Sequence, residues 1–163
     1  MPRNVIDVDF AAQMISERST SGAILLFDFA AAFPSMSHDF MWDVLSCIGL
    51  PDSYINMLKL FYKRNLHFMN AAGCWIESVT VHSGVRQGCP LSPLLFALCA
   101  DILLRELASH IRGDEVLRAF ADDTAMVVEN YARSMPGLSV VFQEFQSISA
   151  LSLNIRKTGC IPL

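Results

Sequence analysis

The chain has 163 residues, a net charge of −4 and an apolar fraction of 53%. This length suits one domain with a substantial core. No stretch reaches the roughly 18 uninterrupted apolar residues of a membrane-spanning helix, and an acidic balance argues against a free-standing nucleic-acid-binding module. There is no N-terminal signal-peptide pattern, and the five cysteines include no Cys-x-x-Cys pair. We therefore expect an intracellular protein with reduced thiols and no structural zinc.

The first two expected elements are a helix over residues 8–17 and a buried strand over residues 23–27. The strand ends on Asp28, which is the only charge in a long apolar stretch that continues through residue 33. A carboxylate in such surroundings is costly unless it is paired or binds a cation. The alternative is that Asp28 caps a following helix.

Two helices and a hairpin are expected next, over residues 39–48, about 51–64 and 66–81, with Ser37 as the cap of the first helix. The second helix and the residues after it carry the main local concentration of positive charge. This patch could contact a phosphate backbone, or it could be a solvated helix face that complements the helix C-terminus. Its members are Lys59, Lys63, Arg64 and His67.

Residues 83–93 form a loop rich in Gly, Pro and Ser that leads into an apolar helix expected over residues 93–110. Its glycines let the backbone approach a ligand closely, and we expect Ser92 to cap the helix. Arg86 and Gln87 lie just before the helix N-terminus, which suits a phosphate-bearing ligand. Taken alone, the segment favours an ordinary loop and cap.

Asp122 and Asp123 are adjacent acids between two apolar runs, residues 117–121 and 124–128, which predicts a β-hairpin with two carboxylates at its tip. Adjacent like charges repel, and a divalent cation such as Mg²⁺ would offset that repulsion. A solvated acidic turn is the alternative. If this hairpin lies beside the strand that ends at Asp28, the carboxylates could hold two metals for in-line phosphoryl transfer.

In chain order, these segments resemble the A, B and C motifs of reverse transcriptases. Residues 153–158 resemble motif D, and the B string resembles the non-LTR (LINE-like) branch more than the retroviral one. The similarity extends over nearly the whole chain, back to Arg3. The three motifs are Phe27-Asp28 with Ala32-Phe33, then Gly-Val-Arg-Gln-Gly-Cys-Pro-Leu-Ser-Pro at residues 84–93, then Phe120-Ala121-Asp122-Asp123.

The resemblance implies an α+β palm, in which an antiparallel sheet carries the catalytic aspartates and helices back it. Residues 1–20 would be the end of the fingers, and residues 21–163 would be the palm with motifs A to D. The implied reaction is RNA-directed DNA synthesis, in which deoxynucleotides are added to a primer 3′-hydroxyl on an RNA template. The chain departs from the LINE-like pattern at two places. Pro34 stands where that pattern often has an Asp, and Ala30-Ala31 precede Ala32-Phe33 where a basic or polar residue is common. Neither change affects the acidic positions.

The resemblance also assigns roles to individual residues. Asp28 and Asp122 would hold two Mg²⁺ ions, for which Mn²⁺ could substitute. The Phe29 carbonyl would assist, and Asp123 would support them. Lys157 would approach the departing pyrophosphate as a proton donor, although a lone lysine near a chain end is often only solvated.

Four further residues are implied to form the substrate pocket. Phe33 would lie under the incoming sugar and exclude a ribose 2′-hydroxyl, unless it is simply a core residue. Arg86, Gln87 and Gly88 would shape the site for the nucleotide and template. The implied partners are an RNA template, a DNA primer, deoxynucleoside triphosphates and the rest of a polyprotein with fingers, thumb and a possible endonuclease, in the nucleus or cytoplasm and without a membrane.

Two other interpretations remain open from the sequence. The chain could be an inactive relic or domesticated fragment that binds RNA or a protein. It could also be a non-enzymatic interaction module that uses its excess of apolar residues as a binding surface, with the acids as solvated turns.

Overall fold

A computed structural model describes residues 2–63 and 66–163. The helices are α1 (Pro2–Ser16), α2 (Ala32–Ser35), α3 (His38–Cys47), α4 (Asp52–Tyr62), α5 (Ser92–Ser109) and α6 (Tyr131–Ser149). The strands are β1 (Ala23–Phe27), β2 (Leu66–Ala71), β3 (Cys74–Thr80), β4 (Val116–Phe120), β5 (Asp123–Val128) and β6 (Gly159–Pro162). The order along the chain is α1, β1, α2, α3, α4, β2, β3, α5, β4, β5, α6 and β6.

The centre of the fold is a four-stranded sheet in the order β4-β5-β1-β6, in which every neighbouring pair is antiparallel. β1 pairs with β5 from Ala23↔Val128 to Phe27↔Thr124. This confirms the expectation that the strand ending at Asp28 lies beside the acidic hairpin. The mixed helices and antiparallel sheet confirm the predicted α+β fold class.

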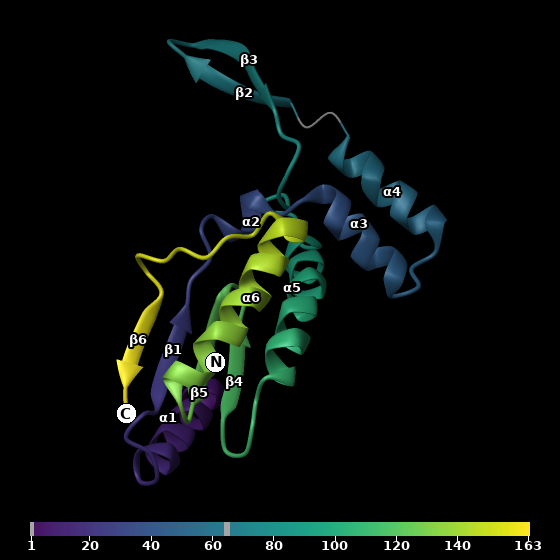
Figure 1. The fold of residues 1–163 in the computed structure, drawn as a ribbon. Helices are drawn as coiled ribbons and strands as arrows, with labels where there is room; N and C mark the ends of the chain where they lie inside the picture. The colour runs from purple at the N-terminus through teal and green to yellow at the C-terminus, as the bar shows by residue number, and fades with distance from the viewer. Residues whose placement is uncertain (1, 64–65) are drawn as a thin grey trace.

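Helices lie against both faces of the sheet, α5 and α6 on one and α1 on the other, as Figure 1 shows. Leu25 and Phe27 of β1 and Met126 of β5 point to the larger core, which includes residues of α5 and α6. Val127 of β5 points to the opposite face, where it packs on Ala12 and other residues of α1. Side chains alternate between the two faces of a strand, so adjacent residues of β5 reach separate cores.

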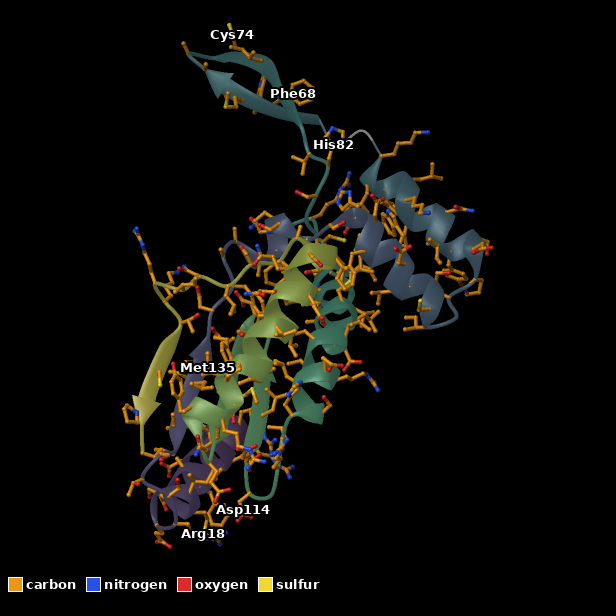
Figure 2. All side chains as sticks on the ribbon, in the orientation of Figure 1. Arg18, Phe68, Cys74, His82, Asp114 and Met135 are labelled. Carbon is orange, nitrogen blue, oxygen red and sulfur yellow. The ribbon has the colours of Figure 1, made fainter. Side chains whose placement is uncertain are left out.

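Helices α3 and α4 lie beside the sheet layer, and the hairpin β2–β3 projects away from the rest of the chain (Figure 1). Phe68 of β2 and Trp75 of β3 expose 53% and 72% of their surface. Figure 2 shows Phe68 and Cys74 on this projecting hairpin, far from the paired Arg18 and Asp114 at the other end of the molecule. The hairpin therefore contributes little to the core.

No helix in the described parts of the chain combines the length and apolarity needed to cross a membrane.

Two local predictions about helix starts were wrong. Leu91 occupies the N-cap of α5 and makes no side-chain cap hydrogen bond, whereas Ser92 is already helical. In the sequence, Met135-Pro136-Gly137 predicts the start of a helix that reaches about residue 151. The structure starts α6 earlier, because Asn130 caps it by accepting a hydrogen bond from the Arg133 N–H, so that Pro136 lies inside the helix. The predicted Ser37 cap of α3 is confirmed by a 3.3 Å hydrogen bond from the Phe40 N–H.

Candidate active site

The acidic residues meet where β1 and the β4–β5 hairpin end. The last pairs of the two ladders are Phe27↔Thr124 and Phe120↔Asp123. One step beyond Phe27↔Thr124, the antiparallel register brings Asp28 opposite Asp123. Asp122 lies in the turn, directly before that residue. The backbone therefore places the three aspartates at one end of the sheet.

The turn that presents Asp122 is a tight two-residue connection, Ala121-Asp122. Ala121 has φ 56°, in the left-handed region that L-residues rarely occupy. Two-residue hairpin turns need a positive φ at their first central residue, so the left-handed residue is an alanine and neither aspartate. Such a residue stores about 1–3 kcal/mol of strain, and strained positions of this kind cluster at functional sites.

Asp28 has an incompletely satisfied carboxylate. Its Oδ2 atom is buried and has no hydrogen-bond partner. The closest cation is the Nζ atom of Lys157 at 3.9 Å, which is beyond hydrogen-bond length. A buried carboxylate oxygen without a donor is costly, and a cation bound to that oxygen would remove the cost. The site therefore fits a divalent metal ion at Asp28.

The backbone beside Asp28 supplies one further oxygen. Phe29 forms an isolated antiparallel bridge with Leu153. The hydrogen bonds of this bridge are made by the neighbours of Phe29, because Asn154 donates to the Asp28 carbonyl at 2.8 Å and Ala30 donates to Ser152 at 2.9 Å. In such a pair the central residue turns its own N–H and C=O to the other side. That side faces the β4–β5 hairpin, which carries the two aspartates.

The ligand set for a metal at this end of the sheet consists of oxygens only. Across the described residues, no three His, Cys, Asp or Glu side chains are gathered as a metal-binding cluster. The candidate donors that the backbone places at this end of the sheet are Asp28, Asp122, Asp123 and the Phe29 carbonyl. Hard oxygen donors of this type suit Mg²⁺ or Mn²⁺ better than zinc.

Residues 153–158 bring Lys157 to the site. The N–H groups of Lys157 and Thr158 both donate to the Asn154 carbonyl, which closes a turn. Asn154 is itself anchored to the Asp28 carbonyl. The anchor explains why Lys157, whose side chain is 70% exposed, still reaches within 3.9 Å of Asp28. Asn154 is a positioning residue that the sequence pattern alone did not single out.

Phe33 lies at a cavity of about 420 Å³ that is otherwise lined by the loop before α5. Its ring stacks on Phe96 of α5 with 4.6 Å between the centroids. One face of the ring thus packs on the core while the residue still borders the cavity, so the core contact leaves room for a ligand beside Phe33. The structure also brings Arg86, Gln87 and Gly88 to this cavity.

The loop before α5 is fixed to the segment that follows β1. Gly84 and Val85 donate backbone hydrogen bonds to the Met36 and Phe33 carbonyls at 2.7 and 2.8 Å. Gly84 has φ 83°, and a Cβ there would lie 2.5 Å from Pro34 backbone atoms. Only glycine fits this position. These contacts tie the loop that lines the cavity to the segment that follows Asp28.

Ser92 and His38 also brace this loop, in ways that the sequence did not predict. The Ser92 hydroxyl donates to the Arg86 carbonyl at 2.6 Å and so closes the loop instead of capping α5. His38 places Nε2 2.8 Å from the Gly84 carbonyl, 46 positions away along the chain. No sequence signal links these two positions.

Asp123 borders a second cavity, of about 420 Å³, between the N-terminal part of α1 and the sheet. In its wall, Arg118 of β4 pairs with Asp7 of α1 at 2.8 Å, and the Asn4 amide donates to the Ala119 carbonyl at 3.0 Å. These contacts hold α1 against the hairpin that carries the acidic pair.

Comparison with known proteins identifies the family. The family described as "Reverse transcriptase (RNA-dependent DNA polymerase)" matches residues 1–161. The Pol polyprotein of the R2DM retrotransposable element of Drosophila melanogaster is 33% identical over 162 residues, covering 94% of this chain and 15% of the relative. The R2 Pol polyprotein of Nasonia vitripennis is 36% identical over 114 residues, covering 65% of this chain and 11% of the relative.

Solved structures show the same fold at low identity. Apo telomerase from Candida tropicalis, truncated from its C-terminal domain, aligns with a TM-score of 0.71 at 13% identity, covering 98% of this chain and 34% of that one. Telomerase from the same organism, in complex with a fragment of telomeric RNA, aligns with a TM-score of 0.73 at 11% identity, covering 96% of this chain and 28% of that one. The fold, the motif order and the family match agree: the chain belongs to the reverse transcriptase family, in its non-LTR retrotransposon branch.

Proposed function

We propose that this chain is the catalytic palm of an RNA-directed DNA polymerase from a LINE-like mobile element. The reaction would transfer a deoxynucleotide to a primer 3′-hydroxyl on an RNA template and release pyrophosphate. One observation carries the proposal: the β1–β5 register brings Asp28 to the acidic turn of the hairpin, with an unpartnered Oδ2 on Asp28. A bound cation would offset the cost of this unpartnered oxygen.

Asp28 and Asp122 would be the metal ligands, assisted by the Phe29 carbonyl, with Asp123 in support. Two divalent cations bound there, Mg²⁺ or Mn²⁺, would supply charge neutralisation and alignment for an in-line displacement. The protein itself would contribute mainly positioning and a preorganised charge distribution, as phosphoryl transfer generally requires. The hydrogen bonds from Asn154 to Asp28 and along β1–β5 support such a rigid arrangement.

The cavity at Phe33 would hold the incoming nucleotide. Arg86 and Gln87 supply positive charge and hydrogen-bonding capacity along its wall, and Gly88 leaves room for close approach of a ligand. The Phe33 ring, fixed on Phe96, would exclude a ribose 2′-hydroxyl. Lys157 would donate a proton to the departing pyrophosphate oxygen, a role that its place beside Asp28 supports.

The chain spans 15% and 11% of the two R2 polyproteins described above. We therefore propose that the activity belongs to a longer polyprotein, in which residues 1–20 end the fingers and residues 21–163 form the palm. Fingers, thumb and a possible endonuclease would supply the grip on RNA template and DNA primer. We expect this polyprotein to act inside the cell, in the nucleus or cytoplasm and without a membrane.

The test is extension of a DNA primer annealed to an RNA template, with deoxynucleotides and Mg²⁺. The assay compares this chain with a parent polyprotein that carries fingers and thumb. We expect extension by the parent protein, none by the isolated palm, and none by either with a chelator. If the folded parent protein does not extend the primer, the proposal fails in favour of an inactive relic that binds RNA or a protein.

A further inference from the structure

A second feature that suits nucleic acid lies on α3 and α4, away from the acidic end of the sheet. Three aromatic rings meet there: the His38 ring lies edge-on to Tyr62 with 5.0 Å between centroids, and Trp42 lies edge-on to Tyr62 at 5.6 Å. Trp42 is only partly buried. Helix α3 supplies two of the rings and the last residue of α4 supplies the third. We call these three residues the aromatic cluster.

The aromatic cluster borders a cavity of about 440 Å³ whose remaining wall comes from α4. Lys59 and Lys63 line this wall, together with Asn56 and Leu60. The Lys59 ammonium lies 5.8 Å from the centroid of the Trp42 ring. Within the described part of the chain, no residue lining this cavity is acidic, although the chain as a whole has a net charge of −4. Positive charge and an aromatic face therefore coincide here.

Tyr62 of the aromatic cluster also carries an unused hydrogen-bonding group. The Tyr62 hydroxyl oxygen is buried and has no hydrogen-bond partner. A buried Tyr hydroxyl usually finds a partner, and leaving it unpaired costs free energy. The hydroxyl is closed to solvent, so it marks a buried polar group without a partner and not a ligand contact.

The aromatic cluster is connected to the proposed nucleotide cavity. His38 contacts the Gly84 carbonyl at 2.8 Å, and the Arg86 guanidinium lies 5.8 Å from the centroid of the Tyr62 ring. Arg86 also lines the cavity at Phe33. Arg86 therefore lies between the two cavities.

We propose that the aromatic cluster, with Lys59 and Lys63, binds a single-stranded segment of nucleic acid beyond the catalytic centre. An unpaired base would stack on Trp42, and the two lysines would neutralise backbone phosphates. Sequence-independent single-strand binding uses this combination of aromatic faces with a positively charged groove. The identification of the ligand as template RNA rests on the proposed function. The expectation that this surface binds a single strand rests only on its rings and lysines.

The chain contains only two tryptophans, which makes the proposal testable by fluorescence. In a Trp75→Phe background, Trp42 is the sole tryptophan reporter. The probes are a uridine 12-mer and a thymidine 12-mer, titrated without nucleotides and with a chelator present. We expect saturable quenching of Trp42, stronger with the uridine 12-mer if the surface holds template RNA. Because the assay needs no catalysis, its failure overturns this proposal alone, whereas a failure of primer extension overturns the proposed function alone.

Two sets of variants separate stacking from charge. Trp42→Leu, read by anisotropy of a labelled uridine 12-mer, should weaken binding at least about fivefold. Lys59→Gln with Lys63→Gln leaves the rings in place and should lower the slope of log K against log salt by about 1.4, which corresponds to two phosphate contacts on a single strand. Circular dichroism checks that each variant is folded.

The control is Arg105→Gln, which removes one positive charge from an exposed arginine on α5 that pairs with Asp101, so it is matched to each single lysine substitution and the two lysine changes are also made one at a time. It should leave both the affinity and the salt slope unchanged. The proposal is overturned if Trp42 is not quenched or if the control variant matches the lysine variants. It is also overturned if a 12-base-pair duplex binds equally with the same lysine dependence, since paired bases cannot stack on Trp42.

Discussion

The Nζ atom of Lys157 lies 3.9 Å from Oδ2 of Asp28, although the two residues come from opposite ends of the chain. The backbone explains the proximity, because Asn154 donates to the Asp28 carbonyl and then closes the turn that carries Lys157. In the proposed function, an ammonium at this position would reach the phosphate oxygens of a nucleotide whose metals Asp28 would hold. The two side chains would then act in one site.

Lys157→Ala should slow nucleotide incorporation by about 100-fold in the parent polyprotein, the lower range for the loss of a general acid. Nucleotide affinity should change much less than the rate at saturating nucleotide. Single-turnover incorporation measures both quantities. Arg156→Ala is the matched control, since Arg156 is the exposed neighbour of Lys157. A Lys157→Ala rate within twofold of the unmodified protein would exclude the proton-donor role.

Phe33→Val should weaken the discrimination against ribonucleotides. A smaller side chain at the cavity leaves room for a 2′-hydroxyl, so the ratio of kcat/KM for ribonucleotides to that for deoxynucleotides should rise at least about tenfold, or about 1.4 kcal/mol. Phe96→Leu removes the same ring stack from the buried side and serves as the control. An unchanged ratio in Phe33→Val would leave Phe33 as a core residue only.

Gly84→Ala should destabilise the fold more than Gly88→Ala. Both glycines have a positive φ, 83° and 84°, so an alanine is strained at either position. A Cβ at Gly88 meets nothing within 4 Å, whereas one at Gly84 would lie 2.5 Å from the Pro34 backbone. We expect a loss of about 1 kcal/mol for Gly88→Ala and at least about 2 kcal/mol more for Gly84→Ala. Urea unfolding measures the difference, and equal losses would contradict the tight contact.

Cys99 should be the unreactive thiol of the chain. It is fully buried in α5, and this burial raises its pKa to about 12. Because the thiolate is the reactive form, raising the pH from 7 to 9 should accelerate modification of exposed Cys47, Cys74 and Cys160 but not of Cys99. Thiol titration followed by mass spectrometry checks this, with denatured protein as the control. Modification of native Cys99 at the rate of Cys47 would contradict the core packing.

The raised pKa of Cys99 also has a consequence for stability. Above pH 9 the unfolded thiol releases its proton while the folded thiol keeps it, so this residue should lower the free energy of unfolding as the pH rises from 9 towards 12. The contribution is fully present below pH 9. Cys99→Ala should lose this part of the pH dependence.

The sequence predicted the parts of the site that depend on local patterns. The apolar run before Asp28, the hairpin around Asp122 and the glycine-rich loop are each marked by neighbouring residues. The adjacency of β1 and β5 was predicted on the assumption that their acids share one function. The register of the two strands confirms the adjacency. The left-handed turn residue was not predictable, because Ala121 has no intrinsic preference for a positive φ.

The remaining features depend on contacts that no local sequence pattern specifies. Ser92 has the residue type of a cap, but its hydroxyl is used by the Arg86 carbonyl, which lies in the preceding loop. Trp42 and Tyr62 come together only because α3 and α4 pack as a pair, so the aromatic cluster has no signature in the sequence. Of the basic residues noted beside it, Arg64 and the side chain of His67 lie outside the described residues.

The role of Asp122 is the central claim, and the most direct measurement is the Mg²⁺-dependent primer extension rate of Asp122→Asn in the parent polyprotein on an RNA template. Asp52→Asn, which makes the same change at the exposed start of α4, is the control. We predict that Asp122→Asn lowers the rate at least about 1,000-fold, comparable to the loss of an essential electrostatic group, while Asp52→Asn extends normally. Extension by Asp122→Asn at the unmodified rate would contradict the assignment of this end of the sheet as the catalytic centre.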